Sequence, residues 1–461
     1  MDKLDQLLKS YEQEMVDTLR ELVRIPSVDG EPLPGKPFGE ACAQVLDVAL
    51  KKAEAMGFET FNDENYAGHV SYGQGDKTLG ILAHLDVVPE GEDWTVPPYE
   101  ALIRDGFMYG RGTTDNKCSC VSCLYALRAI REAGIQLKDR VLLIMGCNEE
   151  KGSEDMKHYM AHVGMPDYGF SPDSGFPVCY AEKGIHRVEI AAKFDGESPI
   201  VSIEAGQAVN IVPNRCKATV KGCKMCTERL KNRAAQLGVP CTVNVRDGVL
   251  DVQVEGVAAH GASPASGKNA ASLMLEVLRA LDLGSAQKAV DFICNVMGAD
   301  GWDGAGLNIK LEDEPSGALT ANLGILRADA QGLMIQLDIR QPVTASFDDV
   351  LARIQGVCAS YGAEAKSVSR SEPLYQPVDG ELVSTLMKVY KETTGRDDQP
   401  FSMGGGTYAR SMHNAVAFGP SLPGSKSCGA HGPDEKLFLE EMFTASRIYA
   451  RTIVALAGKK D

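Results

Sequence analysis

Residues 79–88 read LGILAHLDVV, an apolar run that carries a histidine and an aspartate near its end. Gly75 and Asp76 precede the run, so the pattern is typical of a buried strand that starts after a turn. A second apolar run, VLLIMGC at 141–147, is followed by two adjacent glutamates. In open α/β sheets, ligands bind beyond the carboxyl ends of the strands. The two runs therefore predict an α/β fold with a site at one edge of its sheet.

Helical patterns alternate with these strands. Apolar residues recur at helical spacing in several stretches, which are 4–24, 38–56, 117–133 and 153–163. Glycine or proline ends most of them, as at Pro26, Gly57 and Gly134. Strands that alternate with helices indicate a mixed α/β sheet flanked by helices on both faces.

The pattern changes near residue 186. Short alternating strands are predicted at 187–194, 241–246, 250–254, 319–326 and 332–340, and helices at 268–281 and 347–361. Because a similar strand-and-helix set occurs twice, we predict that 186–382 is an inserted α+β lid domain with two lobes. Residues 1–185 and 383–461, with helices near 383–393 and 438–457, would form the two parts of the main domain.

Length, composition and net charge limit what kind of protein this chain can be. The 461 residues are too many for one ordinary core, and 44% hydrophobic and 24% charged residues are average for a globular chain. A net charge of −16 argues against nucleic acid and anionic membranes as partners. Residues 1–28 lack the apolar run of a secretory signal, and no stretch is long and apolar enough to span a membrane. We therefore expect a cytoplasmic protein.

Thirteen cysteines are scattered from Cys42 to Cys428. In a large cytoplasmic protein most should be buried thiols. Two clusters merit attention, namely Cys118, Cys120 and Cys123, and Cys216, Cys223 and Cys226. Neither supplies the four thiolates of a structural zinc site, so metal or redox use stays a secondary alternative.

Five segments place acids and histidines in apolar or glycine-rich settings. They are AHLDVVPEG (83–91) with His84 and Asp86, GRGTTDNK (110–117) with Asp115, GCNEEKGSE (146–154) with Glu149 and Glu150, SPDSG (171–175) with Asp173, and CGAHGPDE (428–435) with His431. A two-metal hydrolytic site needs imidazole and carboxylate ligands and one carboxylate that bridges the ions. If residues 79–88 form one strand, His84 and Asp86 lie on the same face, so Asp86 could orient His84. Taken singly, Asp86 could merely end a strand, the two glutamates could start a solvated helix, and His431 could be an exposed residue. All five in order, mostly where strands end, favour the metal site.

These motifs together resemble the co-catalytic zinc metallopeptidase family that includes aminoacylases, glutamate carboxypeptidases and succinyl-diaminopimelate desuccinylase. The chain is most similar to the PepV-type dipeptidases. Further motifs that carry the resemblance are LVRIPSV (22–28), WTVPPYEALIRDGFMYGRGTTDNK (94–117), SPDSGFP (171–177) and HGPDE (431–435). The resemblance covers essentially the whole chain and implies a zinc-peptidase catalytic domain with an inserted lid.

The resemblance implies a role for each site residue. His84 and Asp173 would hold one ion, Glu150 and His431 the other, and Asp115 would bridge them. Glu149 would be the general base that takes a proton from the water between the ions. The family also often has a cis peptide after the bridging aspartate, here Asp115–Asn116. These ligands suit Zn²⁺, and Mn²⁺ or Co²⁺ tolerate the same donors.

The lid is expected to contribute to the substrate site. By similarity, His260 of GVAAHGASPASGKNA (256–270) stabilises the oxyanion, with Asn210 beside it. Arg340 could clamp the substrate carboxylate bidentately, and the backbone amides of Gly405, Gly406 and Thr407 could bind the same group. The simpler alternatives are a structural or exposed His260, a surface salt bridge for Arg340 and a flexible turn for the glycines.

We therefore predict a metallopeptidase that hydrolyses unblocked dipeptides or small amides. A two-lobed lid would let one chain supply its own His260, so a monomer is expected. The first alternative is an N-acyl amino acid deacylase or desuccinylase that uses the same two metals. The second is a catalytically silent metal-binding or redox protein, against which stands the presence of Glu149.

Overall fold

The computed structural model describes residues 2–298 and 301–459, and its chain divides into two compact units. The first comprises residues 1–181, 374–401 and 406–461, and the second residues 182–373 and 402–405. These bounds differ from the predicted 186 and 382. Residues 374–382 belong to the first unit because Leu374 and Tyr375 form a strand of its sheet.

The first unit is built on a nine-stranded mixed sheet. Strands β6, β3 and β7 are parallel neighbours, and β1, β2 and β9 are paired antiparallel. The order is β1 (Glu59–Asp63), β2 (Ala67–Tyr72), β6 (Arg140–Gly146), β3 (Thr78–His84), β7 (Tyr168–Ser171), β22 (Ala415–Ala417), β9 (Cys179–Glu182) and β20 (Leu374–Tyr375), with β21 (Phe401–Met403) also on β9. Parallel neighbours end at one edge, so the residues after β6, β3 and β7 come together.

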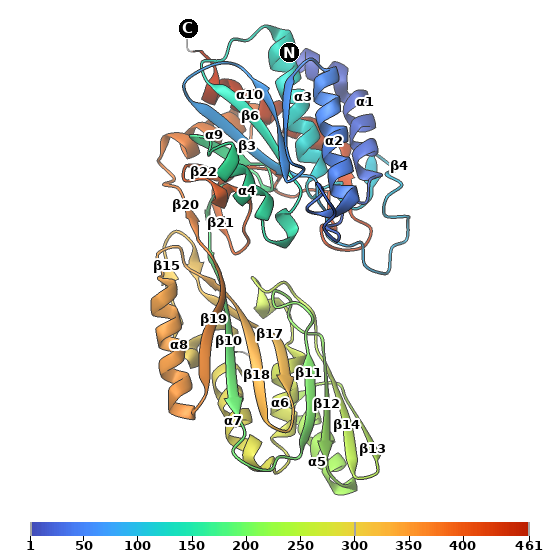
Figure 1. Ribbon diagram of the computed structural model, residues 1–461, viewed down its shortest axis with the longest axis vertical. Coiled ribbons are helices and arrows are strands. Elements are labelled where there is room, and N and C mark those ends of the chain that lie inside the picture. Colours follow the sequence, from blue (N-terminus) through green and yellow to red (C-terminus); the bar gives the residue numbers. More distant parts are fainter. Residues whose placement is uncertain (1, 299–300, 460–461) are drawn as a thin grey trace. The chain divides into compact units, whose positions relative to one another are not determined.

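Helices cover both faces of this sheet (Figure 1). One face carries α1 (Lys3–Val23), α2 (Gly39–Ala55), α3 (Lys117–Ala133), α9 (Glu381–Thr394) and α10 (Leu439–Ala457). On the other face lie α4 (Glu154–His162) and the short helix η6 (Tyr408–Ser411). Each face of the sheet has its own hydrophobic core, and strand β3 contributes to both. Ile81 and Ala83 pack in the core that includes α3, and Leu82 packs in the core that includes α4. The predicted mixed α/β sheet flanked by helices is confirmed.

The strand predicted at 79–88 is shorter than expected and ends at His84. Beyond it the chain leaves the sheet: the Val87 N–H donates to the Ser27 carbonyl at 3.0 Å, and Val87 forms an isolated bridge with Val28. Asp86 therefore lies outside the strand. A second small sheet of β24 (Lys436–Phe438), β5 (Phe107–Tyr109) and β4 (Leu102–Arg104) holds the segment that leads to Asp115.

The second unit contains one continuous antiparallel sheet of eight strands. The order is β13 (Cys241–Arg246), β14 (Val249–Glu255), β12 (Arg215–Lys221), β11 (Ile200–Ala205), β17 (Thr320–Ala328), β18 (Gly332–Gln341), β10 (Gly184–Lys193) and β19 (Glu364–Ser371). The two strand-and-helix sets predicted as lobes thus share one sheet, which is joined where β11 pairs with β17.

Among the described residues of the second unit, the α-helices are α5 (Lys224–Leu237), α6 (Ala270–Leu278), α7 (Gln287–Met297) and α8 (Phe347–Tyr361). Their apolar residues, among them Met274, Phe292 and Ile354, share one core with the strands. The chain enters this unit along β10 and leaves it along β19, and Ile185 pairs with Ser371. The two ends of the inserted segment therefore lie side by side.

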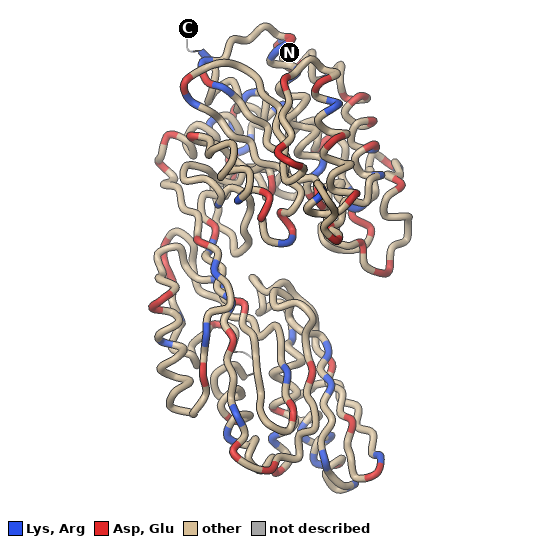
Figure 2. The backbone as a smooth tube through the Cα atoms, viewed as in Figure 1, with Lys and Arg blue, Asp and Glu red and all other residues tan. Residues whose placement is uncertain are grey.

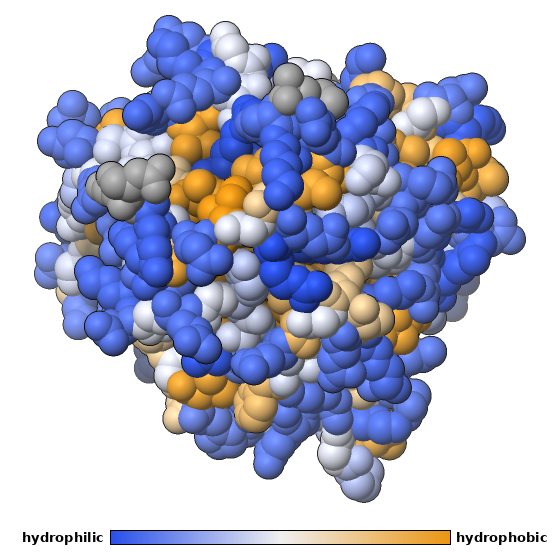
Figure 3. Space-filling model, turned by 90° about the horizontal axis from the view of Figure 1, so that it is seen from above, coloured by the Kyte–Doolittle hydropathy of each residue, from blue (hydrophilic) through white to orange (hydrophobic). Residues whose placement is uncertain are grey.

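Charged residues of both signs are distributed along both units (Figure 2). The face in Figure 3 is mostly hydrophilic, and its apolar patches are separated from one another. Among the described residues, no helix combines the length and the apolar character needed to cross a membrane.

Candidate metal centre

Three parallel strands deliver polar residues to one edge of the first sheet. His84 is the last residue of β3 and is fully buried. Glu149 and Glu150 begin a short 3-10 turn after β6, and Asp173 follows β7 after one proline. Because β3 lies between β6 and β7, the sheet topology brings these four side chains together.

Two groups of candidate ligands share Asp115. The first group is His84, Asp115 and Asp173, and the second is Asp115, Glu150 and His431. Asp115 Oδ1 lies 3.1 Å from His84 Nε2, and Asp115 Oδ2 lies 3.0 Å from His431 Nε2. Each oxygen of one carboxylate thus faces a different imidazole, which is the arrangement that a bridging ligand requires.

The remaining distances complete the two groups. His84 Nε2 lies 3.6 Å from Asp173 Oδ1, and His431 Nε2 lies 3.1 Å from Glu150 Oε1. His84 is buried, whereas the His431 side chain is 52% exposed and has a positive φ of 61°. The second group is therefore the one with the more open access to solvent.

Asp86 contacts both His84 and the Glu149–Glu150 turn. His84 Nδ1 lies 3.0 Å from the Asp86 carbonyl oxygen and 3.4 Å from the Asp86 carboxylate. The carboxylate itself accepts the N–H groups of Glu149 at 3.2 Å and of Glu150 at 3.1 Å. Because Asp86 lies beyond the end of β3, a shared strand face does not explain its contact with His84. Asp86 instead connects the histidine to the Glu149–Glu150 turn.

Glu435 organises the segment that carries Asp115. Its buried carboxylate accepts the N–H groups of Gly112, Thr114 and Asp115 at 3.0, 2.8 and 3.2 Å. Arg111 pairs with the same carboxylate at 2.8 Å and is only 1% exposed. One buried ion pair thus fixes the backbone that presents the shared aspartate.

Asn116 holds Asp173, a member of the first ligand group, in position. Its Nδ2 donates to Asp173 Oδ1 at 2.9 Å and to the Pro172 carbonyl at 2.7 Å. The Asp115–Asn116 peptide bond is cis, as the resemblance implied. Lys117, the next residue, is buried and donates to the carbonyls of Leu22 and Ile25 at 3.0 and 2.8 Å.

The electrostatics of the site favour a bound cation. Burial raises the pKa of Asp173 to about 7. Burial, followed by the Asp173 charge, raises the pKa of Glu149 well above its ordinary value, and burial followed by the Asp115 charge raises that of Glu150. A divalent cation would relieve this crowding of like charges. The donors are imidazole and carboxylate with no thiolate, a set that Zn²⁺ binds and that Mn²⁺ and Co²⁺ accept.

Asp115 differs from its neighbours. Burial opposes its ionisation, but hydrogen bonds to His431 and His84 outweigh burial and hold the pKa of Asp115 well below its ordinary range. The shared carboxylate is therefore the one that is most firmly ionised. This is the state that a bridging ligand must have.

In the second unit, His260 and Asn210 lie on neighbouring segments. Ile211 and His260 form an isolated bridge, and the Gly261 N–H donates to the Asn210 carbonyl at 2.7 Å. The Ala262 N–H donates to His260 Nδ1 at 3.1 Å, which places the proton of the neutral ring on Nε2. The His260 ring therefore presents a hydrogen-bond donor, as an oxyanion-stabilising group must.

Arg340 is buried near the end of β18 and is 4% exposed. Its Nε and Nη2 lie 2.9 and 2.8 Å from Asp338 Oδ2, and its Nη1 donates to the Gly404 carbonyl at 2.7 Å. The surface salt bridge considered as the alternative does not describe this residue, because the ion pair is buried. An added Cβ at Gly261 would lie 2.7 Å from Asp338 Oδ2, so the His260 segment packs against this pair.

The glycine run crosses the boundary between the units. Gly405 belongs to the second unit, and Gly406 and Thr407 belong to the first. An added Cβ at Gly406 would lie 2.6 Å from Cζ of Arg410, so the guanidinium packs directly on that backbone. The Thr407 hydroxyl accepts the Ala409 N–H at 3.1 Å and caps η6. The end of the run is therefore packed at Gly406 and tied to η6 at Thr407.

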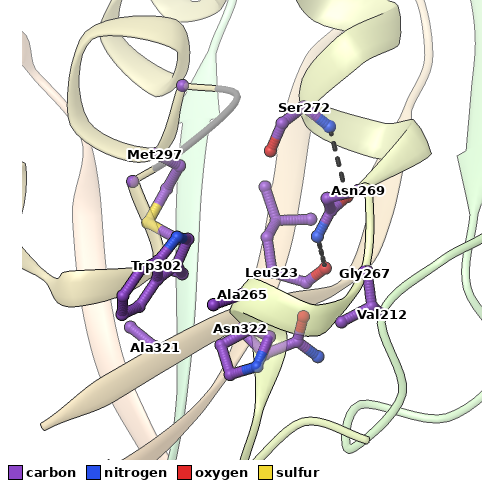
Figure 4. Close-up of a pocket in the computed structure, with 13 residues that line it drawn as sticks. Val212, Ala265, Gly267, Asn269, Ser272, Met297, Trp302, Ala321, Asn322 and Leu323 are labelled. Carbon is purple, nitrogen blue, oxygen red and sulfur yellow. Dashed lines mark hydrogen bonds between the residues drawn. The ribbon is translucent and has the colours of Figure 1, made fainter. Parts of the chain in front are cut away.

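A small pocket of about 50 Å³ in the second unit lies between Asn269, Trp302 and Asn322 (Figure 4). None of the predicted site residues lines it. Ligand pockets commonly measure roughly 300–1,000 Å³, so this one is too small for a dipeptide. The Asn269 side chain connects two segments of the pocket wall. It accepts the N–H groups of Ala271 and Ser272 and donates to the Leu323 carbonyl at 2.7 Å.

Sequence reasoning missed several buried polar residues that hold the ligands in place, namely Arg111, Asn116, Lys117, Asp155 and Glu435. Asp155 accepts the N–H groups of Cys147 and Asn148 at 2.7 and 2.8 Å and a close hydrogen bond from the Tyr408 hydroxyl. Four of the five lie within the quoted motifs, and Asp155 directly follows the motif 146–154. A polar or charged residue inside a glycine-rich or apolar segment is the signal that could have singled them out.

The chain matches the model of peptidase family M20/M25/M40 over residues 80–455. It is 35% identical over 459 residues to a Bacillus subtilis (strain 168) protein named "Putative dipeptidase YtjP", with 96% of this chain and 97% of the relative covered. The chain belongs to this family. Its enzyme class is accordingly that of a metallopeptidase, a hydrolase of peptide or amide bonds.

Solved structures of family members share the fold. Aminoacylhistidine dipeptidase from Vibrio alginolyticus matches with a TM-score of 0.59 at 15% identity, with 96% of each chain covered. Bacillus subtilis YXEP, described as a dinuclear metal binding peptidase from the M20 family, matches with a TM-score of 0.51 at 12% identity, with 97% of this chain and 99% of that chain covered. At these identities the likeness concerns the fold alone.

Proposed function

We propose that this metallopeptidase hydrolyses unblocked dipeptides with two divalent metal ions. His84, Asp115 and Asp173 would hold one ion, and Asp115, Glu150 and His431 the other. The observation that carries the proposal is that the two oxygens of Asp115 face two different imidazoles at 3.1 and 3.0 Å. The names of the curated relatives, which describe dipeptidases, support the substrate class.

Glu149 acts as the general base in this proposal. When bound, the two ions supply Lewis acidity that polarises the scissile carbonyl and acidifies the attacking water. Glu149 accepts the proton of that water and delivers it to the leaving amine. Its raised pKa, caused by burial and by the Asp173 charge, suits a group that must both accept and release a proton. Asp86 holds the Glu149–Glu150 turn through two N–H groups and thereby positions the base.

The second unit supplies the groups that recognise the substrate. His260 donates from Nε2 to the oxyanion, with Asn210 beside it. Arg340, held by Asp338, binds the carboxylate of the dipeptide together with the amides of Gly405, Gly406 and Thr407. Because both strand-and-helix sets of this unit lie in one sheet within one chain, we propose a monomer that uses its own His260.

We further propose that the bound metal is Zn²⁺ and that the protein acts in the cytoplasm. Zn²⁺ is the ion that His and carboxylate donors favour, and Mn²⁺ and Co²⁺ are the alternatives. The net charge of −16 argues against nucleic acid and anionic membranes as partners. The thirteen free thiols suit the reducing cytoplasm.

A substrate panel tests the proposal. The apo protein is prepared with a chelator, reloaded with Zn²⁺, Mn²⁺ or Co²⁺, and offered free and N-acylated dipeptides side by side. Cleavage of free dipeptides that depends on added metal is the expected result. Cleavage of N-acylated substrates alone would instead establish a deacylase or desuccinylase, and no hydrolysis with any of the three metals would refute the proposed activity.

A further inference from the structure

A third group of possible metal ligands lies in the first unit and shares no residue with the centre described above. Asp63 ends β1, and His158 and His162 lie on α4. One ligand atom from each of the three lies within 4.8 Å of the other two. His158 and His162 are four residues apart, so the helix places both imidazoles on one face.

The hairpin between β1 and β2 presents the carboxylate. Glu64 and Asn65 have positive φ values of 53° and 62°, and the Tyr66 N–H donates to the Asp63 carbonyl at 2.9 Å. This tight turn brings the Tyr66 ring onto the His158 ring, with the centroids 3.7 Å apart and the planes 7° from parallel. The stacking fixes the orientation of the His158 imidazole and directs Nε2 toward Asp63.

The distances between the donors are those of ligands around one ion. His162 Nδ1 lies 3.3 Å from Asp63 Oδ1, and His158 Nε2 lies 3.6 Å from Asp63 Oδ2. Zn–N and Zn–O bonds of about 2.0–2.1 Å in a tetrahedron separate neighbouring donors by about 3.3 Å. Each imidazole therefore already lies about as far from the Asp63 carboxylate as one bound zinc ion would require, and the three donors lie within 4.8 Å of one another.

Hydrogen bonds within the cluster explain only part of this geometry. A hydrogen bond accounts for the contact between His162 and Asp63 Oδ1, but the 3.6 Å between His158 Nε2 and Asp63 Oδ2 is too long for one. Both of these atoms are buried and have no hydrogen-bond partner, and Asp63 is only 4% exposed. A buried carboxylate oxygen and a buried imidazole nitrogen that face each other without a hydrogen bond are costly to maintain. A cation between them would satisfy both.

We propose that Asp63, His158 and His162 bind one zinc-class transition-metal ion that ties the β1–β2 hairpin to α4. Two imidazoles and one carboxylate are borderline-hard donors that suit Zn²⁺. The Glu64 carboxylate, 3.8 Å from His158 Nε2 and 73% exposed, or water can supply the fourth position. The ion can enter from solvent past His162, whose side chain is 51% exposed.

Metal counting at equilibrium tests this site. Apo protein is dialysed against micromolar free Zn²⁺, and the bound zinc per chain is compared among the wild type, the double variant His158→Ala/His162→Ala and His413→Ala. The last is a matched control because His413 is exposed and lies outside all three ligand groups. We expect the double variant to bind one ion fewer per chain and the control to bind as many as the wild type. Equal zinc in all three proteins would overturn the proposal.

Two further measurements separate the loss of this ion from misfolding and from any change at the catalytic centre. The single variant His162→Gln changes an exposed side chain and should lose the same ion while its circular dichroism spectrum stays unchanged. In crystals soaked with zinc, anomalous scattering at the zinc edge should give a peak between Asp63, His158 and His162. A peak at the Asp115 centre without one here would overturn this site and leave the proposed function intact.

Discussion

Glu149 and Asp173 are both half-buried carboxyls that follow a parallel strand, yet we propose different roles for them. Asp173 faces His84 Nε2 at 3.6 Å and receives a hydrogen bond from Asn116 at 2.9 Å, so its position is fixed for binding an ion. Glu149 has its backbone held by Asp86, and its pKa is raised first by burial and then by the charge of Asp173. Two acids thus acquire separate functions from their neighbours.

The role of Glu149 leads to the first prediction. Glu149→Gln removes the proton acceptor and keeps the size of the side chain. The kcat for a free dipeptide should fall by about 10²- to 10⁴-fold, the usual worth of a general base. Metal content should stay at the wild-type value, because Glu149 belongs to neither ligand group.

Glu154→Gln is the matched control for this measurement, since Glu154 is an exposed acid five residues further along the chain that pairs with Lys157. It should retain wild-type kcat. If Glu149→Gln kept full kcat as well, the base would have to be another residue.

The buried pair of Arg111 and Glu435 leads to the second prediction. Glu435→Ala leaves the Arg111 guanidinium buried without its partner and removes the acceptor of three backbone N–H groups. Removing one partner of a buried ion pair typically costs about 3–5 kcal/mol, so the free energy of unfolding should fall by roughly that amount. Urea denaturation measures this free energy.

Glu392→Ala serves as the comparison for Glu435→Ala. Glu392 is 65% exposed and lies 3.9 Å from Lys388, a surface pair that is worth less than about 1 kcal/mol. A loss of stability in Glu435→Ala no larger than in Glu392→Ala would show that the pair does not hold the segment 111–115.

At the scale of single residues, the sequence was informative wherever a residue type can be recognised by its chemistry. His84, Asp115, Glu150, Asp173 and His431 could be selected because imidazole and carboxylate ligands recur in glycine-rich or strand-end segments. Arg111, Asn116 and Glu435 were missed, because a supporting residue is defined by its partners in space, and only its polar character within a glycine-rich or apolar segment marks it in the sequence. Asp86 was selected for a shared strand face that the structure does not have, because β3 ends two residues earlier.

At the scale of elements, most amphipathic helices were predicted closely, whereas α7 (Gln287–Met297), α5 and the short strands were not. The predicted 117–133 is the helix Lys117–Ala133, and Gly134 follows it in the left-handed conformation with a φ of 77°. Helix α5 (Lys224–Leu237) was missed because it buries only Thr227, Leu230 and Ala234, too few to define an apolar face. Strands of two or three residues, such as β20 and β22, exist only through their pairing with distant segments.

The contact between β2 and α4 leads to a third prediction, which concerns pH. His69 on β2 is 6% exposed, and Tyr159 on α4 places its hydroxyl 2.6 Å from His69 Nδ1. Burial lowers the pKa of His69 to about 4. Between pH 6.5 and pH 4 the unfolded chain therefore binds a proton at this site that the folded chain does not. Stability that is present above pH 6.5 is lost as the pH falls, by up to about 3 kcal/mol from this residue.

Tryptophan fluorescence can follow this loss in the first unit alone. The chain has two tryptophans, Trp94 in the first unit and Trp302 in the second, so Trp302→Phe leaves a reporter for the first. In that background, His69→Gln should reduce the difference in unfolding free energy between pH 7 and pH 4.5. His413→Gln, at an exposed position, should leave it unchanged. An undiminished difference in His69→Gln would assign the pH dependence to other groups.

At the scale of the whole molecule, the chain builds two units with separate hydrophobic cores. The motifs located the centre in the first unit, but the unit boundaries depend on which sheet each strand joins. Residues 374–382 illustrate this: we predicted them as the end of the insertion, and β20 nevertheless pairs in the first sheet. Local patterns cannot decide between two sheets that both accept a short strand.

The inserted segment leads to the last prediction. Residues 182–373 contain the whole eight-stranded sheet and its core, and the paired Ile185 and Ser371 bring the two ends of the segment together. Expressed alone, this segment should fold and unfold cooperatively, as followed by Trp302 fluorescence. The complementary protein, residues 1–181 joined to 374–461 by a short Gly/Ser linker, keeps every residue of both Asp115 ligand groups. It should bind zinc but fail to hydrolyse dipeptides, because Asn210, His260 and Arg340 leave with the insertion. Full activity of the shortened protein would remove the proposed roles of these three residues, and loss of zinc binding would show that the insertion is needed to form the centre itself.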